Sequence, residues 1–272
     1  MVKINYHMHT TYSDGRLSPK ETIDLAIKLG LKFICFTDHY KNPPNTNPWG
    51  TIFSEDYLNE IKELKEKFKD KIDISFGAEF NWFTNEKEWI KKEVKKINYD
   101  FIIGSVHGVS KNGKYFTITS SEKSWLELFK EFGNIKDIIK EYYREIREMA
   151  NSGLFDSVGH FDVVKIYTNN DFENSDWYKK EVIKTLETIK KSGMCIEINT
   201  SGWKRAKCKE QYPNIWILKE IKKLDIPLTI GADSHFIDEI DFELERAIEI
   251  AKDLRFKSVM KFKNRKRTEV EI

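Results

Sequence analysis

The chain has 272 residues, of which 40% are hydrophobic and 33% are charged, and its formal net charge at neutral pH is +2. The hydrophobic share is that of a globular protein with a sizeable core, and the near-balanced charge argues against nucleic acid or a membrane surface as the main partner. No apolar stretch approaches the ~18 residues that a membrane span requires.

The cysteines and the first residues indicate where the protein resides. Cys35, Cys195 and Cys208 are an odd number of thiols spread over the chain, which is not a disulfide framework. Residues 2–6 are strand-like and lack the charged, apolar and small-residue layout of a signal peptide. We therefore expect a cytoplasmic protein. Because α/β barrels reach this length as one domain, residues 1–272 are expected to form a single domain.

Short apolar runs alternate with amphipathic segments along the whole chain. The predicted strands are residues 2–6, 32–37, 73–79, 100–106, 155–159, 194–199 and 228–232. The predicted helices lie between Ser18 and Gly30, and over residues 54–70, 135–152, 175–192, 213–224 and about 240–254. Repeated β-α units of this kind predict a parallel sheet covered by helices.

Several of these helices carry start and stop residues. Ser18-Pro19-Lys20-Glu21 is a capping box with proline at the first helical position, and Gly30 ends that helix. Pro213 opens the fifth helix. The basic run from Arg255 to Arg267 alternates with apolar residues, which favours a half-buried terminal strand over a nucleic-acid surface.

All six histidines lie at or just past the ends of predicted strands, and three carboxylates accompany them. In chain order these residues are His7, His9, Asp14, His39, Glu79, His107, His160, Asp233 and His235. Candidate ligands follow strands one to five and strand seven. A closed barrel gathers side chains from every strand end, whereas an open doubly wound sheet gathers them near one switch point, so a barrel is the better prediction.

Imidazole nitrogen together with carboxylate oxygen is the donor set that borderline divalent ions prefer. His7-Met8-His9 places two rings on the same side of an extended segment. A single histidine at a strand end is more often a hydrogen-bonded structural residue. Here all six histidines lie at strand ends together with three carboxylates, which favours a polynuclear metal site.

These motifs resemble those of the polymerase-and-histidinol-phosphatase (PHP) superfamily, and within it the histidinol-phosphatase branch. The matching motifs are His7-x-His9-x4-Asp14-Gly15, Thr37-Asp38-His39, Gly77-Ala78-Glu79, Gly104-Ser105-Val106-His107, Gly159-His160-x-Asp162, Glu197-Ile198-Asn199-Thr200-Ser201-Gly202 and Gly231-Ala232-Asp233-Ser234-His235. The resemblance covers essentially the full length and implies a distorted (β/α)7 TIM-like barrel of the PHP type.

The resemblance also implies a site for three divalent transition-metal ions (Zn, Mn or Fe). The expected ligands are His7, His9, Glu79 and Asp233 for the first ion, Glu79 as a bridge with His107 and His160 for the second, and Asp14, His39 and His235 for the third. Asp38 and Asp162 are expected to orient ligand rings, with a turn or helix-capping role as an equal alternative.

The activity implied is hydrolysis of a phosphate monoester, in particular of L-histidinol phosphate to L-histidinol and phosphate. Three divalent ions, three carboxylates and a bridging hydroxide leave a charge of about +2, which a monoester dianion neutralises. We expect the metal-bridging hydroxide to attack phosphorus, with Glu79 as the catalytic bridge. Asp162 is a candidate proton donor to the leaving alcohol.

Cationic side chains are expected to hold the phosphate, and the candidates are Lys165, Lys204 and Arg205. Relatives in this family commonly carry arginine at the positions matching Lys165 and Lys204. Lysine acts as a point charge and lacks the bidentate fork of arginine. For each lysine, a solvated surface position is the alternative.

Three other functions are weighed against this one. A PHP-type nuclease or nucleotide phosphoesterase would keep the metal site, but the near-neutral charge argues against a long nucleic-acid track. A non-catalytic metal-binding module would have lost ligands, and none is missing from the motifs. A barrel amidohydrolase acting on C–N bonds would usually have a lysine or carbamylated bridge in place of Glu79.

Overall fold

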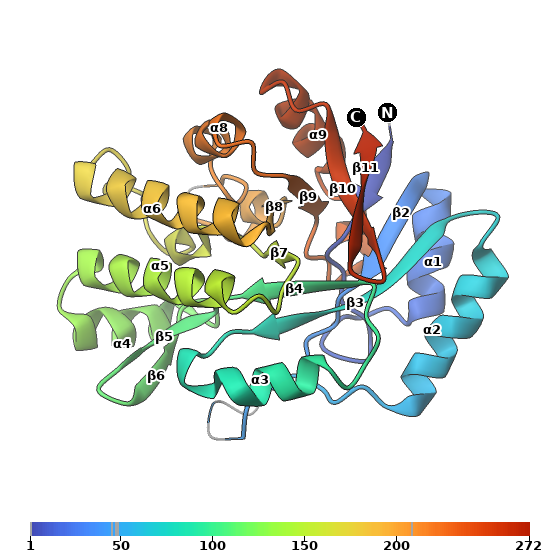
Figure 1. Ribbon diagram of the computed structural model, residues 1–272, viewed down its shortest axis with the longest axis horizontal. Helices are drawn as coiled ribbons and strands as arrows, with labels where there is room; N and C mark the ends of the chain where they lie inside the picture. The colour runs from blue at the N-terminus through green and yellow to red at the C-terminus, as the bar shows by residue number, and fades with distance from the viewer. Residues whose placement is uncertain (1, 45, 47–48, 208) are drawn as a thin grey trace.

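A seven-stranded parallel sheet forms the centre of the molecule in the computed structural model, which describes residues 2–44, 46, 49–207 and 209–272 (Figure 1). Its strands follow one another in the order β1-β2-β3-β4-β7-β8-β9. Their bounds are β1 (Lys3–Asn5), β2 (Leu31–Phe36), β3 (Asp73–Asn81), β4 (Phe101–Ser105), β7 (Ser157–Val158), β8 (Cys195–Asn199) and β9 (Leu228–Gly231). Each corresponds to one predicted strand.

The first and last strands of this sheet come together near their carboxyl ends. Tyr6 N donates a hydrogen bond to Ile230 O at 2.8 Å, and His9 N donates to Ser234 O at 2.9 Å. Met8 and Ser234 also form an isolated parallel bridge. These contacts nearly close the sheet on itself, so the predicted distorted seven-stranded barrel is confirmed.

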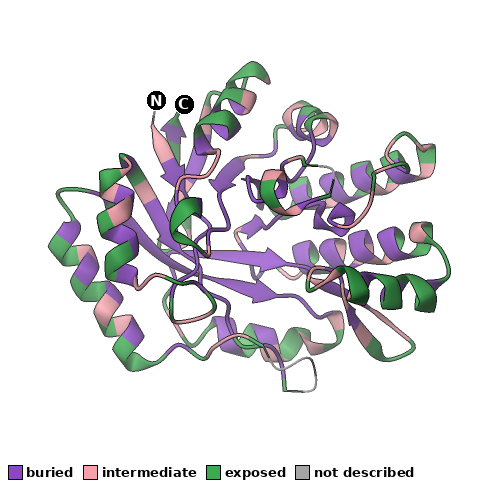
Figure 2. Ribbon diagram, turned by 180° about the vertical axis from the view of Figure 1, so that it is seen from behind, coloured by how far each residue is buried: buried purple, intermediate pink, exposed green. Residues whose placement is uncertain are grey.

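Helices cover the outside of the sheet, with exposed residues on their outer faces and buried residues against the strands (Figures 1 and 2). Their bounds are α1 (Pro19–Lys28), α2 (Glu55–Phe68), α3 (Lys87–Val94), α4 (Glu122–Phe132), α5 (Ile135–Asn151), α6 (Asp176–Ser192), α7 (Gly202–Arg205), α8 (Ile215–Lys223) and α9 (Leu244–Asp253). The predicted helices are all present. In the described part of the chain, none of the helices combines the length and the apolar character needed to span a bilayer.

The capping residues predicted the start of helix α1 correctly, but the predicted start of helix α8 was wrong. The capping box of α1 is formed: Ser18 N donates to the Glu21 carboxylate at 2.8 Å, and Glu21 N donates to Ser18 Oγ at 3.3 Å. Helix α8 begins after an Asn214 cap rather than at Pro213. Helices α3, α4 and α7 were not predicted from the sequence. Each of them buries no more than three residues.

Two antiparallel hairpins are added to the barrel. Strands β5 (Gly108–Lys111) and β6 (Lys114–Thr117) follow β4 directly. Strands β10 (Ser258–Lys263) and β11 (Lys266–Glu271) form a C-terminal hairpin where one terminal strand was predicted. Phe262 of this hairpin is buried, and its N–H donates to Tyr6 Oη at 3.0 Å. The apolar residues of the basic run therefore pack against the barrel.

Two of the three cysteines lie in the described part of the chain. Cys35 and Cys195 are buried free thiols, as expected for strand residues of a protein without a disulfide framework. Burial raises the pKa of the Cys195 thiol to about 12, so that the thiol stays protonated and unreactive at neutral pH. Cys208 lies outside the described residues.

Asp100 connects the C-terminal hairpin to the barrel. Its Oδ2 accepts hydrogen bonds from Lys65 Nζ at 2.6 Å and Phe76 N at 3.0 Å, and its Oδ1 accepts one from Asn264 N at 3.0 Å. Burial would raise the pKa of this carboxyl, but hydrogen bonds from Lys65 and the two amides outweigh burial and lower the pKa. Its contribution to stability is therefore present above the unfolded pKa of about 4 and is lost as the pH falls through the folded pKa.

We expect Asp100→Asn to lower the free energy of unfolding by about 2 kcal/mol at pH 7, because charged hydrogen bonds are lost from a buried site. Urea denaturation followed by circular dichroism at pH 7 and pH 3 measures this, and the difference from wild type should shrink at pH 3. Asp70→Asn, at an exposed position, is the control. Equal midpoints for wild type and Asp100→Asn at pH 7 would contradict the anchoring role.

Candidate metal centre

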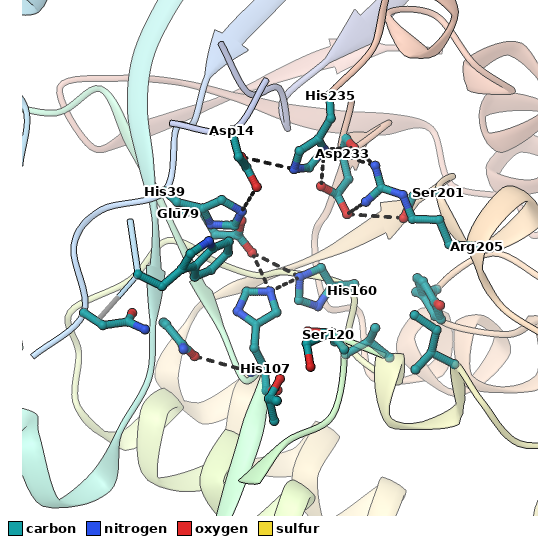
Figure 3. A pocket seen from close by; sticks show the side chains of 18 of the residues that line it. Asp14, His39, Glu79, His107, Ser120, His160, Ser201, Arg205, Asp233 and His235 are labelled. Carbon is teal, nitrogen blue, oxygen red and sulfur yellow. Dashed lines mark hydrogen bonds and ion pairs between the residues drawn. The ribbon is translucent and has the colours of Figure 1, made fainter. Parts of the chain in front are cut away.

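The predicted ligands come together at the carboxyl ends of the barrel strands, and most of them surround one cavity (Figure 3). Six are buried, His107 and His235 are partly buried, and Asp14 is exposed. His7 and His9, on the segment after β1, lie beneath the cavity with exposed fractions of 0% and 2%. Parallel strands explain this convergence, because all of them end at the same face of the barrel.

Glu79, near the end of β3, lies in the middle of the cluster and is 1% exposed. Its Oε1 faces Nε2 of His160 at 3.0 Å and Nε2 of His107 at 3.3 Å. Its Oε2 faces a different set of imidazole nitrogens at 3.0 to 3.5 Å, those of His39, His7 and His9. The two oxygens of one carboxylate thus point to two separate groups of nitrogen donors, which is the arrangement of a bridging ligand.

Three overlapping groups have donor atoms close enough to share an ion. Within each group the donor atoms lie within 4.8 Å of one another, and the groups are His7, His9 and Glu79; Glu79, His107 and His160; and His9, Asp14, His39 and His235. Asp233 borders the first group, with Oδ1 3.4 Å from His9 Nε2 and 3.7 Å from His7 Nε2. His9 belongs to two groups, whereas the family resemblance implies a role in the first alone.

The donor atoms fit divalent cations. Several are buried and have no hydrogen-bond partner among the described residues: Nε2 of His7, both ring nitrogens of His9, and Oε2 of Glu79. Buried polar atoms of folded proteins normally have a partner, so these atoms point to a ligand held between them. A divalent ion would satisfy nitrogen and oxygen donors together.

The charges of His9, His107 and Glu79 suit coordination. Burial and the neighbouring His235 and His39 lower the pKa of His9 well below its usual value, and burial lowers the pKa of His107 despite Glu79. Burial would raise the pKa of Glu79, but the surrounding imidazoles outweigh burial and hold the pKa well below its usual range. His9 and His107 are therefore neutral and Glu79 is ionised near pH 7, which are the forms that bind metal ions. Burial would lower the pKa of His7, His160 and His235, but neighbouring carboxylates outweigh burial and raise it, so metal binding to these three rings would displace a proton.

Asp38 holds the loop between His9 and Asp14 rather than an imidazole ring. It is fully buried, and its Oδ1 accepts hydrogen bonds from Thr10 N at 2.7 Å and Ser13 Oγ at 2.6 Å. Its Oδ2 accepts from Thr10 Oγ1 and from the Tyr57 hydroxyl. Asp38 therefore positions the segment that carries Asp14.

The expected roles of Asp162 and Lys165 at the reacting phosphate are not supported by their positions. Both side chains are fully buried, and Lys165 Nζ lies 2.9 Å from Asp162 Oδ2 and 3.2 Å from Glu210 Oε2. Asp162 Oδ2 also accepts a hydrogen bond from Asn214 N. Neither residue is among those that line the cavity in the described chain. The pair is an internal ion pair, because a buried lysine needs a nearby carboxylate.

Of the two adjacent cations on α7, Arg205 reaches the cavity and Lys204 does not. Lys204 Nζ lies 3.0 Å from Asp238 Oδ2 and 2.8 Å from Glu239 Oε1, outside the cavity lining. Arg205 lines the cavity, and its Nη1 donates to Asp233 Oδ2 at 3.1 Å. The position of Lys204 therefore does not support the predicted phosphate contact. The short helix α7 directs Arg205 toward the candidate ligands (Figure 3).

The cavity has a volume of about 360 Å³. The candidate ligands form one side, together with Ser201 and Arg205. Residues of the β5–β6 hairpin and the following segment form another side, and these are Tyr115, Thr117, Thr119 and Ser120. The Trp49 ring lies 3.9 Å from the His39 ring, between centroids. The cavity is therefore large enough for a small substrate and offers hydroxyl and aromatic side chains beside the candidate ligands.

Sequence reasoning missed Glu197 as a site residue. It lies on β8 between Ile196 and Ile198, is 1% exposed, and its Oε1 is 2.8 Å from His7 Nδ1. An acidic residue within an apolar strand was the available signal, because such a residue is buried only when its oxygens find partners.

Comparisons with known proteins show which family this chain is similar to. Residues 5–201 match the PHP domain family. The histidinol-phosphatase of Bacillus subtilis is 27% identical over 268 residues, which cover 92% of this chain and 99% of that protein. A probable histidinol-phosphatase of Deinococcus radiodurans is 26% identical over 266 residues, which cover 96% of each chain.

Among solved structures, this chain is similar to the histidinol phosphate phosphatase of Lactococcus lactis subsp. lactis, crystallised in complex with zinc, L-histidinol and phosphate. The TM-score is 0.82 at 25% sequence identity, and the match covers 98% of both chains. The domain match extends over most of the chain, and the barrel and the clustered donors agree with it. The chain therefore belongs to the PHP domain family.

Proposed function

We propose that this chain is a metal-dependent phosphomonoesterase that hydrolyses L-histidinol phosphate to L-histidinol and phosphate. The observation that carries the proposal is the set of three overlapping donor groups around Glu79, open to a cavity of about 360 Å³. The relatives named histidinol-phosphatase, and the Lactococcus complex with L-histidinol and phosphate, support this substrate. Because the donors come from positions 7 to 235, we also propose that residues 1–272 act as one domain.

The proposed ligands are those named from the family resemblance, with Glu79 as the bridge and Zn, Mn or Fe as the ions. When bound, such ions would polarise the phosphoryl oxygens and lower the pKa of water. The chain's own residues hold the donors in place. Asp38 anchors the segment before Asp14, and Arg205 lies against Asp233. With all six imidazoles among the proposed ligands, a histidine nucleophile or histidine acid is not part of the proposal.

Arg205 is proposed to bind the substrate phosphate. It is the single lysine or arginine that lines the cavity in the described part of the chain. Its contacts with Asp233 and Glu239 hold the guanidinium in place. A guanidinium has five N–H donors, more than these contacts use, and a phosphate can accept two of them side by side.

We expect Arg205→Met to lower kcat/KM roughly 10- to 100-fold, as the loss of charge-assisted hydrogen bonds predicts. The matched control is Lys204→Met, which removes a neighbouring cation outside the cavity and should change kcat/KM little. Metal content is measured on each protein, since Arg205 also contacts Asp233. A Lys204→Met enzyme more impaired than Arg205→Met, at equal metal content, would contradict the assignment.

The substrate is tested by phosphate release from L-histidinol phosphate, a nucleoside monophosphate and a single-stranded oligonucleotide, with metal content measured on the same sample. We expect the highest kcat/KM for L-histidinol phosphate. Faster cleavage of the oligonucleotide would favour a PHP-type nuclease instead.

A further inference from the structure

Glu197 is a buried carboxylate in the middle of β8, and both of its oxygens are engaged. Neighbouring side chains of a strand point to opposite sides, so Glu197 and Asn199 share one face. Glu197 is 1% exposed, and Asn199 is fully buried. An ionised carboxylate at such a depth is tolerated only where hydrogen bonds replace its lost water. The hydrogen-bond partners of Glu197 therefore indicate its role.

The first oxygen of Glu197 determines the hydrogen position on His7. Oε1 lies 2.8 Å from His7 Nδ1, and because a carboxylate only accepts hydrogen bonds, Nδ1 carries the hydrogen. With a cation in the group, the lone pair for coordination would then be on Nε2, which lies 3.2 Å from Glu79 Oε2 and 3.7 Å from Asp233 Oδ1. A carboxylate on the far nitrogen is a common means of orienting a metal-binding imidazole and raising its basicity.

The second oxygen of Glu197 holds the backbone of His160. Oε2 accepts hydrogen bonds from His160 N at 2.9 Å and from Asn199 Nδ2 at 2.9 Å. His160 has a φ of 24°, which a residue with a side chain rarely adopts. Such a conformation persists only when the surrounding contacts determine it. In this position the His160 ring has Nε2 3.0 Å from Glu79 Oε1.

Gly231 leaves the space for the pair formed by Glu197 and His7. A Cβ at position 231 would lie 2.2 Å from Glu197 Oε1 and 2.4 Å from His7 Cβ, closer than real contacts allow. Any larger residue at this point of β9 would separate the carboxylate from the ring. The contact between Glu197 and His7 therefore also depends on the glycine at position 231 of strand β9.

We propose that Glu197 is a positioning residue that couples two of the cation groups. It sets the tautomer of His7 in one group and the backbone of His160 in the other, while Glu79 bridges the two groups from the opposite side. The inference rests on the metal ligands of the proposed function, but not on the identity of the substrate.

The test compares Glu197→Gln with wild type by titrating the metal-free proteins with zinc in competition with a chromogenic chelator. An amide of the same size can accept through one atom only, so it cannot accept from both His7 Nδ1 and His160 N. We expect zinc affinity to fall 10- to 100-fold, as for other residues that orient metal ligands. We also expect kcat to fall while KM for L-histidinol phosphate changes little.

The matched control is Glu145→Gln, at a buried glutamate on α5 that contacts Thr84 and Arg144. It should keep the zinc affinity of wild type. A folded Glu197→Gln protein with wild-type zinc affinity would overturn the proposal. Wild-type protein that binds zinc tightly but does not hydrolyse L-histidinol phosphate would refute the proposed substrate and leave this inference intact.

A second measurement needs no variant. In ¹⁵N NMR spectra of zinc-loaded wild-type protein with labelled histidine, His7 should carry its hydrogen on Nδ1 and leave Nε2 for the ion. Observation of the hydrogen on Nε2 of His7 would overturn the proposal even if Glu197→Gln fails to fold.

Discussion

Replacement of Glu79 by glutamine is expected to lower kcat by roughly a thousandfold or more. The two oxygens of Glu79 face separate sets of imidazoles, so the substitution replaces one bridging oxygen by an amide nitrogen that does not bind a cation. Metal ions contribute several kcal/mol to the stabilisation of a phosphoryl transition state, and about 4 kcal/mol corresponds to a factor of about a thousand.

The measurement is the steady-state rate of phosphate release, with metal content and circular dichroism recorded on the same preparations. Glu145→Gln again serves as the control, since it makes the same chemical change at a buried carboxylate outside the cluster. Full turnover by a folded Glu79→Gln protein would refute the bridging role.

Removal of the metal ions with a chelator is expected to abolish activity and to lower stability. An ion that binds only the folded chain stabilises it by about 2.7 kcal/mol at a free concentration one hundred times its Kd. The Asp14 side chain is 38% exposed, whereas that of Glu79 is 1% exposed. We therefore expect the ion of the group with Asp14 to leave first, in a separate and faster phase.

Elemental analysis during dialysis, with activity and thermal unfolding followed on the same aliquots, tests this expectation. Asp14→Asn should remove the fast phase and leave the slow release unchanged. A metal-free sample that retains full activity would refute a metal-dependent reaction altogether.

The prediction of the barrel from the sequence rested on local patterns. Short apolar runs of strand length alternate with amphipathic segments, and Gly30 marks the end of the first helix. Helix α3 and the β5–β6 hairpin were not predicted, because their short segments carry few residues of any periodic pattern. The two-residue strand β7 was predicted as longer, since an apolar run does not reveal how much of it pairs with its neighbours.

The sequence by itself determined which residues gather at the candidate metal centre. His39, Glu79 and His107 lie near the carboxyl ends of strands β2, β3 and β4, and the ends of parallel strands meet at one face of the barrel. Contacts between distant segments could not be determined in this way. Glu197 meets His7 across 190 residues, and this pairing depends on the register of the closed barrel.

The tertiary structure alone decided which cations face the cavity. Lys204 and Arg205 stand side by side just past the motif that ends at Gly202, and only the orientation of the short helix α7 places Arg205 at the candidate ligands. Lys165 follows His160 as a phosphate-binding residue would, yet burial beside Asp162 makes it an internal ion pair. Residue type and spacing determine which chemistry is present, whereas the direction of each side chain follows from packing between segments that are distant in the chain.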